Sequence, residues 1–179
     1  QLVDLSKQYF NRIYDTLGVT LTDADLAGES TYNDELAGIC DELEAQGIAT
    51  ISDGALCVFL DGYTGREGKP LPLIIRKSDS GYGYGTTDLA TVRRRVRDLA
   101  ADRMLYVIGA PQSQHLQMVF EVARMAGWLR PPAEAVHVSV GNVLGEDRKG
   151  LRRPFGRALE VSQHPGGAVA AHLLGRRLD

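Results

Sequence analysis

Residues 81–90 carry the side chains best suited to binding a small polar ligand. The stretch reads Gly-Tyr-Gly-Tyr-Gly-Thr-Thr-Asp-Leu-Ala, and its glycines let the backbone approach a ligand closely because they carry no Cβ atom. Asp88 offers a carboxylate, and Tyr84 offers an aromatic face and a hydroxyl. We expect Thr86 or Thr87 to cap a helix that begins there, which places Asp88 near the positive end of that helix. A capped helix after a flexible turn would explain the same pattern without any ligand.

A carboxylate in this position favours a cationic ligand. A guanidinium suits it especially well, because its planar donors can form two parallel hydrogen bonds to the carboxylate. Gln112, Gln114 and His115 add further polar side chains in a later segment. The sequence has no Ser/His/Asp order that indicates a nucleophile, no Gly-x-Gly-x-x-Gly fingerprint, no P-loop and no metal-binding motif. The residues alone predict a small-molecule pocket, with a cation as the candidate ligand.

The surrounding segments predict an α/β fold, because strand and helix patterns alternate after residue 70. The expected order is a strand at 71–76 that is buried on both faces, a helix over 89–99, a strand at 104–108, a helix over 112–125 and a strand at 135–140. This order is typical of right-handed βαβ units and a parallel sheet. Ligands of such sheets bind beyond the carboxyl ends of the strands, so we expect the site in the loops 77–87, 109–113 and 141–148.

The first 70 residues predict a pair of helices and a β-hairpin. Apolar side chains at helical spacing indicate one helix over 5–17 and a second that begins at Asn33 or Asp34, and we expect the two to pack together. Ser52-Asp53-Gly54 is a hairpin signal between two β-prone runs. The expected organisation is therefore a helical and hairpin insertion-like region (1–70), a half with the substrate-binding loops (71–149) and a basic divergent tail (150–179).

The composition is that of a soluble globular protein, with 44% hydrophobic and 24% charged residues in a chain of 179. No apolar run approaches the length of a membrane span, so we expect no membrane contact and a cytoplasmic location. We expect Cys40 and Cys57 to be buried. Residues 148–179 sum to +5 and the first 147 to −8. The tail is compatible with a nucleic-acid contact, although a solvated terminus is the simpler explanation, and we likewise expect the arginines at 93–97 to form a solvated helix face.

Several runs, all in the same order, resemble bacterial arginyl-tRNA synthetases, and the similarity is collinear from about residue 6 to residue 149. It is carried by Gly-Glu-Ser-Thr-Tyr-Asn at 28–33 and Ile-Arg-Lys-Ser-Asp-Ser-Gly-Tyr at 75–82, followed by 84–90, 101–107, 112–115, Gly141 and 144–147. An unrelated nucleotide-binding α/β domain would need these ordered matches to arise by chance. The resemblance implies a partial Rossmann-like parallel sheet, the second half of a class I synthetase catalytic domain.

In that family the domain binds arginine and ATP, forms the aminoacyl adenylate and transfers arginine to tRNA. The arginine-holding Tyr-x-x-x-Asp motif of the family falls on Tyr84 and Asp88, and its glutamine in the next strand–helix loop falls on Gln112. By resemblance, Asp88 pairs with the substrate guanidinium, while Tyr84 and Gln112 orient the amino acid.

The resemblance also places a wall of the ATP pocket, on the adenine side. His137, Val138 and Gly141 correspond to this wall, although a lone histidine on a strand is more often structural. ATP is expected as a substrate, with Mg as a further candidate, and no tightly bound cofactor.

The chain departs from the family in lacking the His-Ile-Gly-His signature, which binds ATP phosphates and stabilises the transition state. For the family's Lys-Met-Ser-Lys-Ser loop, the only candidates are Lys149, Arg152 and Arg153. We therefore expect the chain to be incomplete for catalysis alone and assign no catalytic residue. Half of a Rossmann sheet leaves an open edge and an apolar face, so we expect a second copy or a companion chain to cover it, with tRNA as a further candidate partner. The alternative is a non-catalytic, synthetase-derived module that binds arginine or a protein partner.

Overall fold

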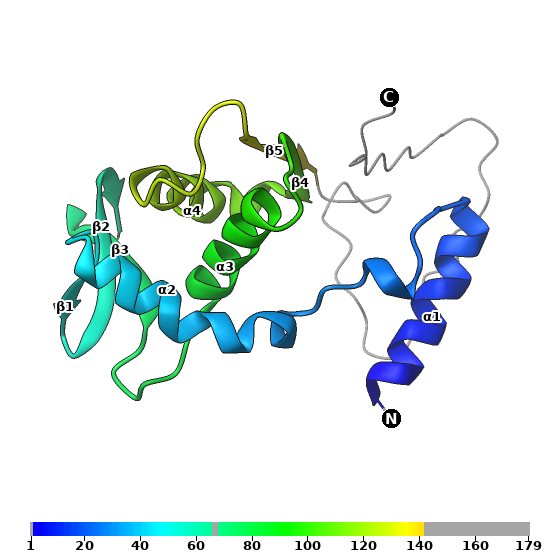
Figure 1. The fold of residues 1–179 in the computed structure, drawn as a ribbon, viewed down its shortest axis with the longest axis horizontal. Coiled ribbons are helices and arrows are strands. Elements are labelled where there is room, and N and C mark those ends of the chain that lie inside the picture. The colour runs from blue at the N-terminus through cyan, green and yellow to red at the C-terminus, as the bar shows by residue number, and fades with distance from the viewer. Residues whose placement is uncertain (1, 66–67, 142–179) are drawn as a thin grey trace, which may run out of the picture.

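The computed structural model describes residues 2–65 and 68–141 as a mixed α/β chain (Figure 1). Its main elements, in chain order, are α1 (Leu2–Leu17), α2 (Asn33–Ala45), β1 (Thr50–Ser52), β2 (Ala55–Thr64), β3 (Pro70–Arg76), α3 (Tyr84–Arg97), β4 (Arg103–Gly109), α4 (Ser113–Met125) and β5 (Glu134–Val140). Short 3-10 turns precede α2 and α4. Within the described residues, no helix combines the length and the apolar character that crossing a membrane requires. The sequence expectations for 142–179, the basic tail included, lie outside the described residues.

The first sheet is antiparallel, with the strand order β1-β2-β3. Ser52 pairs with Ala55 across a two-residue turn, in which Asp53 and Gly54 both have positive φ angles of 49° and 76°. Two such residues give the turn a twist that matches the paired strands, so the predicted hairpin is confirmed. The prediction that 71–76 joins a parallel sheet is wrong, because β3 pairs antiparallel with β2. Its side chains also alternate between buried and exposed, instead of being buried on both faces.

The second sheet contains the predicted βαβ unit. β4 and β5 pair in parallel from Arg103 opposite Glu134 to Gly109 opposite Val140, and α4 makes the crossover between them. The prediction of a parallel sheet is thus confirmed for these two strands. β4 is only half-buried, because its alternate side chains face away from α4.

The hydrophobic core lies where α2, α3 and α4 pack between the two sheets (Figure 1). α2 buries the four residues at its predicted inner positions, which are Leu36, Ile39, Cys40 and Leu43. α3 contributes Leu89 and Val92, and α4 contributes Leu116, Val119, Phe120 and Ala123. Cys57 is also buried, as predicted. The core therefore holds α3 and α4, the two helices that carry the predicted arginine-binding residues, against the rest of the chain.

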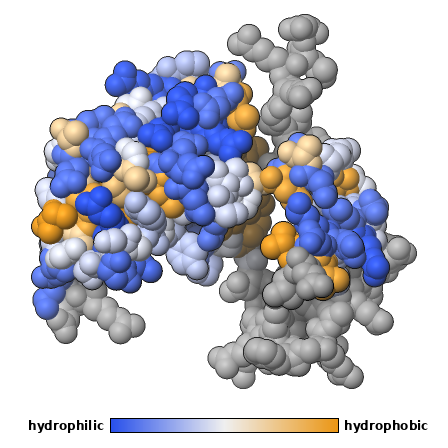
Figure 2. Space-filling view, turned by 60° about the horizontal axis from the view of Figure 1, so that its bottom comes forward, coloured by the Kyte–Doolittle hydropathy of each residue, from blue (hydrophilic) through white to orange (hydrophobic). Residues whose placement is uncertain are grey.

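α1 does not form the predicted packed pair with α2. It lies at the end of an extended connection, well apart from α2 (Figure 1). Five of its apolar side chains are exposed, namely Val3, Leu5, Tyr9, Phe10 and Leu17. Figure 2 shows apolar surface on this separate part of the molecule. Helical periodicity predicted which side of α1 is apolar, but it could not predict what that side contacts.

Candidate functional site

The glycine-rich stretch leads into α3 earlier than the sequence predicted. Gly83 is the N-cap residue, and the helix begins at Tyr84. Gly85 lies so close to β3 that a Cβ atom there would be 3.1 Å from the carbonyl oxygen of Ile74. The buried hydroxyl of Thr86 donates a hydrogen bond to the carbonyl oxygen of Ile75. The prediction that Thr86 or Thr87 caps the helix is therefore wrong: Thr86 fastens the first turn of α3 to β3, and Asp88 lies in the second turn.

Asp88 forms a short hydrogen bond with His115 of α4. The two side chains meet at 2.6 Å between Asp88 Oδ2 and His115 Nε2, and the ring nitrogen donates when the carboxylate is ionised. The Asp88 side chain remains 35% exposed and that of His115 28% exposed. One carboxylate oxygen is thus held in place while solvent still reaches the group. The sequence suggested both residues as polar groups of the site but did not predict that they touch.

Tyr84 and Gln112 lie near this pair along their own helices. Tyr84 is four residues before Asp88, a spacing that places two side chains on the same helix face, and it is 74% exposed. Gln112 is an exposed residue directly before α4, one turn before His115. α4 begins just after the carboxyl end of β4, so His115 and Gln112 lie at the predicted edge of the parallel sheet. The hydrogen bond between Asp88 and His115 brings α3 to the same edge.

His137 and Val138 of β5 point to opposite faces of the sheet, because successive side chains of a strand alternate. His137 pairs with Tyr106 in the register of the sheet, on the face that α4 covers. Its Nε2 donates to the carbonyl oxygen of Ile108 at 2.9 Å, so its Nδ1 is left to accept from the hydroxyl of Ser113 at 3.2 Å. His137 therefore braces the turn that precedes α4. Val138 is exposed on the outer face.

Gly141, the third residue of the expected adenine-side wall, is exposed directly after the end of β5. Because the side chains of His137 and Val138 lie on opposite faces of the sheet, they cannot line the same pocket. A wall formed by both residues would have to consist of the backbone at the end of β5.

Tyr106 lies on β4, with its ring centre 4.9 Å from that of Phe120 of α4. Burial raises the pKa of its phenol, and the guanidinium of Arg95 partly opposes that rise while the Asp88 carboxylate adds to it. The Arg95 guanidinium lies over the Tyr106 ring, 4.9 Å from its centre. The Tyr106 phenol is therefore uncharged beside the Arg95 guanidinium.

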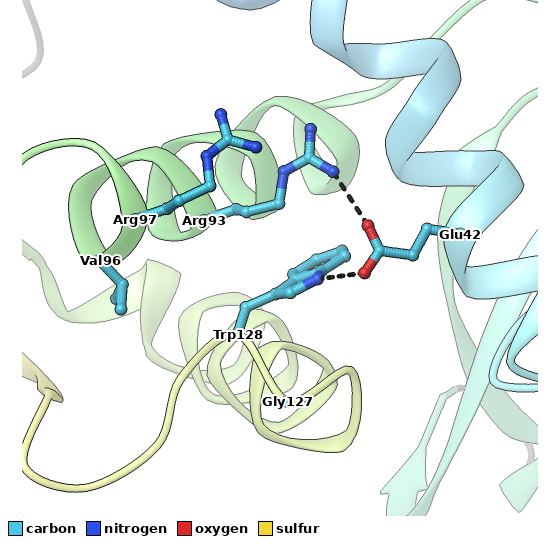
Figure 3. Close-up of a pocket in the computed structure, with 6 residues that line it drawn as sticks. All are labelled: Glu42, Arg93, Val96, Arg97, Gly127 and Trp128. Carbon is cyan, nitrogen blue, oxygen red and sulfur yellow. Dashed lines mark hydrogen bonds and ion pairs between the residues drawn. The ribbon is translucent and has the colours of Figure 1, made fainter.

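A separate hollow of about 310 Å³ opens between α3 and the segment after α4 (Figure 3). Arg93, Arg97, Glu42 and Trp128 line it, together with Val96 and Gly127. The prediction that the arginine run is a solvated face is wrong for Arg93, whose side chain is only 13% exposed. Its guanidinium binds two carboxylates, Glu35 at 3.0 Å and Glu42 at 3.1 Å. Because acidic side chains already satisfy this arginine, the hollow is unsuited to an anionic ligand.

No group of three or more histidine, cysteine, aspartate or glutamate side chains suited to a metal ion occurs in the part of the chain that the structure describes. Residues 84–115 provide one carboxylate that a neighbouring histidine holds in place. The chain is thus a mixed α/β protein whose parallel βαβ unit has polar side chains at its carboxyl edge, the edge at which α/β proteins bind ligands. Residues 1–167 match the family described as tRNA synthetases class I (R), catalytic domain, and the chain belongs to this family.

Relatives with curated descriptions agree with the family match. The arginine–tRNA ligase of Thermobifida fusca is 68% identical over 160 residues, which cover 89% of this chain and 28% of that protein. The arginine–tRNA ligase of Streptomyces avermitilis is 47% identical over 161 residues, which cover 90% of this chain and 27% of that protein. The chain thus spans less than a third of the length of these relatives.

A solved structure shows the same fold. The arginyl-tRNA synthetase of Plasmodium falciparum superposes with a TM-score of 0.71 at 30% sequence identity. The superposition covers 80% of this chain and 24% of the Plasmodium chain.

Proposed function

We propose that this chain is the arginine- and ATP-binding part of an arginine–tRNA ligase catalytic domain. The family match supports the reaction class. The observation that carries the arginine assignment is the Asp88 carboxylate, which is held by His115 through one oxygen and remains open to solvent at the carboxyl edge of β4. A rigid, accessible carboxylate loses little freedom when it binds a guanidinium.

In this proposal the substrate guanidinium binds Asp88. Oδ1 and the remaining lone pair of Oδ2 can accept two parallel N–H donors, the geometry that distinguishes a guanidinium from an ammonium. Tyr84 and Gln112, at the starts of α3 and α4, orient the rest of the amino acid. His115 acts as a positioning residue, because it fixes the carboxylate without contacting the guanidinium.

ATP is proposed to lie along the end of β5, with residues 137–141 as the adenine-side wall. The polar atoms of His137 are already bonded to Ile108 and Ser113, so its part in this wall is to hold the strand end and the turn before α4. Val138 and Gly141 contribute shape and backbone. Mg would bind together with the phosphates of ATP.

We further propose that the chain needs other polypeptide for catalysis, because its sequence contains no His-Ile-Gly-His signature. The outer face of the parallel sheet supports this proposal, since it exposes a row of aliphatic side chains from both strands, namely Leu105, Val107, Val138 and Val140. Such a face is usually covered by a companion chain or a second copy. The proposal includes the division of the chain into residues 1–70, 71–149 and 150–179. It also includes a contact between the tail at 150–179 and tRNA.

Titration calorimetry with arginine tests the assignment of Asp88. A hydrogen bond to a charged group contributes about 1.5–3 kcal/mol, so Asp88→Asn should weaken arginine binding by about tenfold to a hundredfold. Asp102→Asn changes an exposed carboxylate elsewhere and should have no effect. Citrulline, a neutral analogue of arginine, should bind the wild-type chain weakly. Absence of heat with the wild type, or equal affinities for wild type and Asp88→Asn, would refute the assignment.

Arginine-dependent ATP–pyrophosphate exchange tests the proposed incompleteness. We expect exchange only when a polypeptide with the His-Ile-Gly-His half is added. Robust exchange by the isolated chain would show that it is complete. Arginine binding that never leads to exchange, even after this addition, would favour the non-catalytic module instead.

A further inference from the structure

The side chain of Glu42 on α2 joins two elements that are far apart in the sequence (Figure 3). Its Oε2 accepts a hydrogen bond from Arg93 Nη1 of α3 at 3.1 Å. Its Oε1 accepts a hydrogen bond from the indole Nε1 of Trp128, directly after α4, at 2.7 Å. One carboxylate therefore spans α3 and the end of the α4 segment.

The contacts around Glu42 leave Arg93 and Trp128 little freedom. The Arg93 guanidinium lies over the indole ring of Trp128, 5.5 Å from its centre, and its second terminal nitrogen binds Glu35. Arg93 is largely buried, whereas the side chains of Glu35 and Glu42 are 24% and 37% exposed, so salt screens these ion pairs only in part. A change at Glu42 leaves Arg93 Nη1 or the Trp128 indole N–H without its present acceptor, although Glu35 still binds Arg93, and the lost bond favours a shift of α3 or Trp128.

The same two elements carry the arginine site. Arg93 follows Asp88 by five residues on α3. Trp128 lies three residues after the end of α4, the helix that carries His115. A displacement at Arg93 or Trp128 reaches the rest of these helices, because a close-packed interior transmits strain. The 2.6 Å bond between Asp88 and His115 joins α3 to α4 and therefore depends on the separation of the two helices.

We propose that Glu42 is a positioning residue for arginine binding, which holds α3 and α4 at the separation where Asp88 and His115 meet. Glu42 belongs to the insertion-like region at residues 1–70, whereas the proposed arginine-binding residues lie at 84–112. The first region thereby sets the geometry of a site in the second. This inference rests on the proposed role of Asp88 in binding arginine.

Glu42→Gln is the direct test, because glutamine keeps the size of the side chain but has a single acceptor oxygen, so either Arg93 or Trp128 then faces an amide donor. Asp41→Asn is the matched control, since Asp41 is the exposed neighbour on the same helix. The nitrogen chemical shift of His115 Nε2, with Asp88→Ala as the reference for an unpaired ring, reports the Asp88–His115 bond without any ligand. In Glu42→Gln this shift should move towards the Asp88→Ala value, and it should stay unchanged in Asp41→Asn.

Arginine calorimetry gives the second measurement. Small misplacements of a site cost up to about a hundredfold, and we expect Glu42→Gln to bind arginine roughly tenfold more weakly than Asp41→Asn. If Glu42→Gln does not fold, Trp128→Phe removes the indole N–H and part of the ring area, keeps the Arg93–Glu42 bond, and should move both measurements in the same direction by less. A His115 shift and an arginine affinity that match the wild type in the folded variants would overturn the inference. A wild-type chain that binds no arginine would refute the proposed function instead, and the His115 shift would still decide whether Glu42 positions the pair.

Discussion

Replacement of Arg93 by methionine should destabilise the fold, because this residue joins α2 and α3 through charged hydrogen bonds. Its guanidinium binds Glu35 Oε2 at 3.0 Å and Glu42 Oε2 at 3.1 Å and lies 5.5 Å from the Trp128 ring centre. Hydrogen bonds to charged groups contribute about 1.5–3 kcal/mol each, and a cation–π contact about 0.5–1 kcal/mol.

Two features of the structure reduce that sum. The side chains of Glu35 and Glu42 are 24% and 37% exposed, so water can solvate both carboxylates after the substitution. Arg93 Nε is buried without a hydrogen-bond partner, and its removal returns part of the cost of burying it. Methionine also keeps most of the aliphatic packing. We therefore expect a loss of about 2–3 kcal/mol in the free energy of unfolding, or roughly 1 M or more in the urea midpoint.

Urea denaturation followed by Trp128 fluorescence measures this loss, and Arg97→Met is the matched control. Arg97 is one turn further along α3, and its side chain is 57% exposed in ion pairs with Asp98 and Glu35. Its loss should move the urea midpoint much less. If Arg93→Met unfolds at the wild-type midpoint, or no earlier than Arg97→Met, then the arginine run is a solvated face after all and the reasoning above is wrong.

Three further predictions concern single side chains. His115→Gln keeps an amide donor near the position of Nε2 and should retain arginine affinity within a few-fold in calorimetry, whereas His115→Leu should lose roughly tenfold; equal losses would contradict a positioning role. Burial raises the pKa of Cys40 from 9.0 to about 11, so its iodoacetamide alkylation at pH 8 should be slow in the folded chain and fast in urea. The contribution of the neutral thiol to the free energy of unfolding is complete below pH 9 and is lost as the pH rises through 11. Fast alkylation of the folded chain at pH 8 would show that burial does not protect Cys40. Gly85→Ala puts a Cβ atom 3.0 Å from Leu73 Cδ1 and should cost about 1–3 kcal/mol in thermal unfolding, whereas Gly83→Ala, with no contact below 3.5 Å, should cost less, because it loses only the preference of the N-cap for glycine over alanine.

Local patterns predicted those parts of the fold that depend on neighbours in the sequence. The buried face of α2 follows from apolar residues at helical spacing, and the hairpin follows from Asp53-Gly54, which can both adopt positive φ angles. The crossover from β4 through α4 to β5 follows from the alternation of strand and helix patterns. The motif residues Asp88 and Gln112 were correctly expected on α3 and next to α4.

Contacts between distant segments could not be predicted in this way. β-propensity identified the strand at β3 but not its partner, because the pattern of a strand does not encode which strand it pairs with. The charge of Arg93 indicated exposure, yet two glutamates from α2 compensate the cost of burying it. The first turn of α3 lacks a side-chain cap because its N-cap residue is Gly83, and Thr86, which lies inside the helix, binds β3.

For this chain, the order of the residues alone determined the family, the helices and strands in which the motif residues lie, and the carboxylate chemistry at Asp88. Only the tertiary structure decided that His115 holds that carboxylate and that Glu42 connects the two helices behind it. The physical reason is range: helix and hairpin signals act over a few residues, whereas these two contacts join side chains 27 and 86 residues apart.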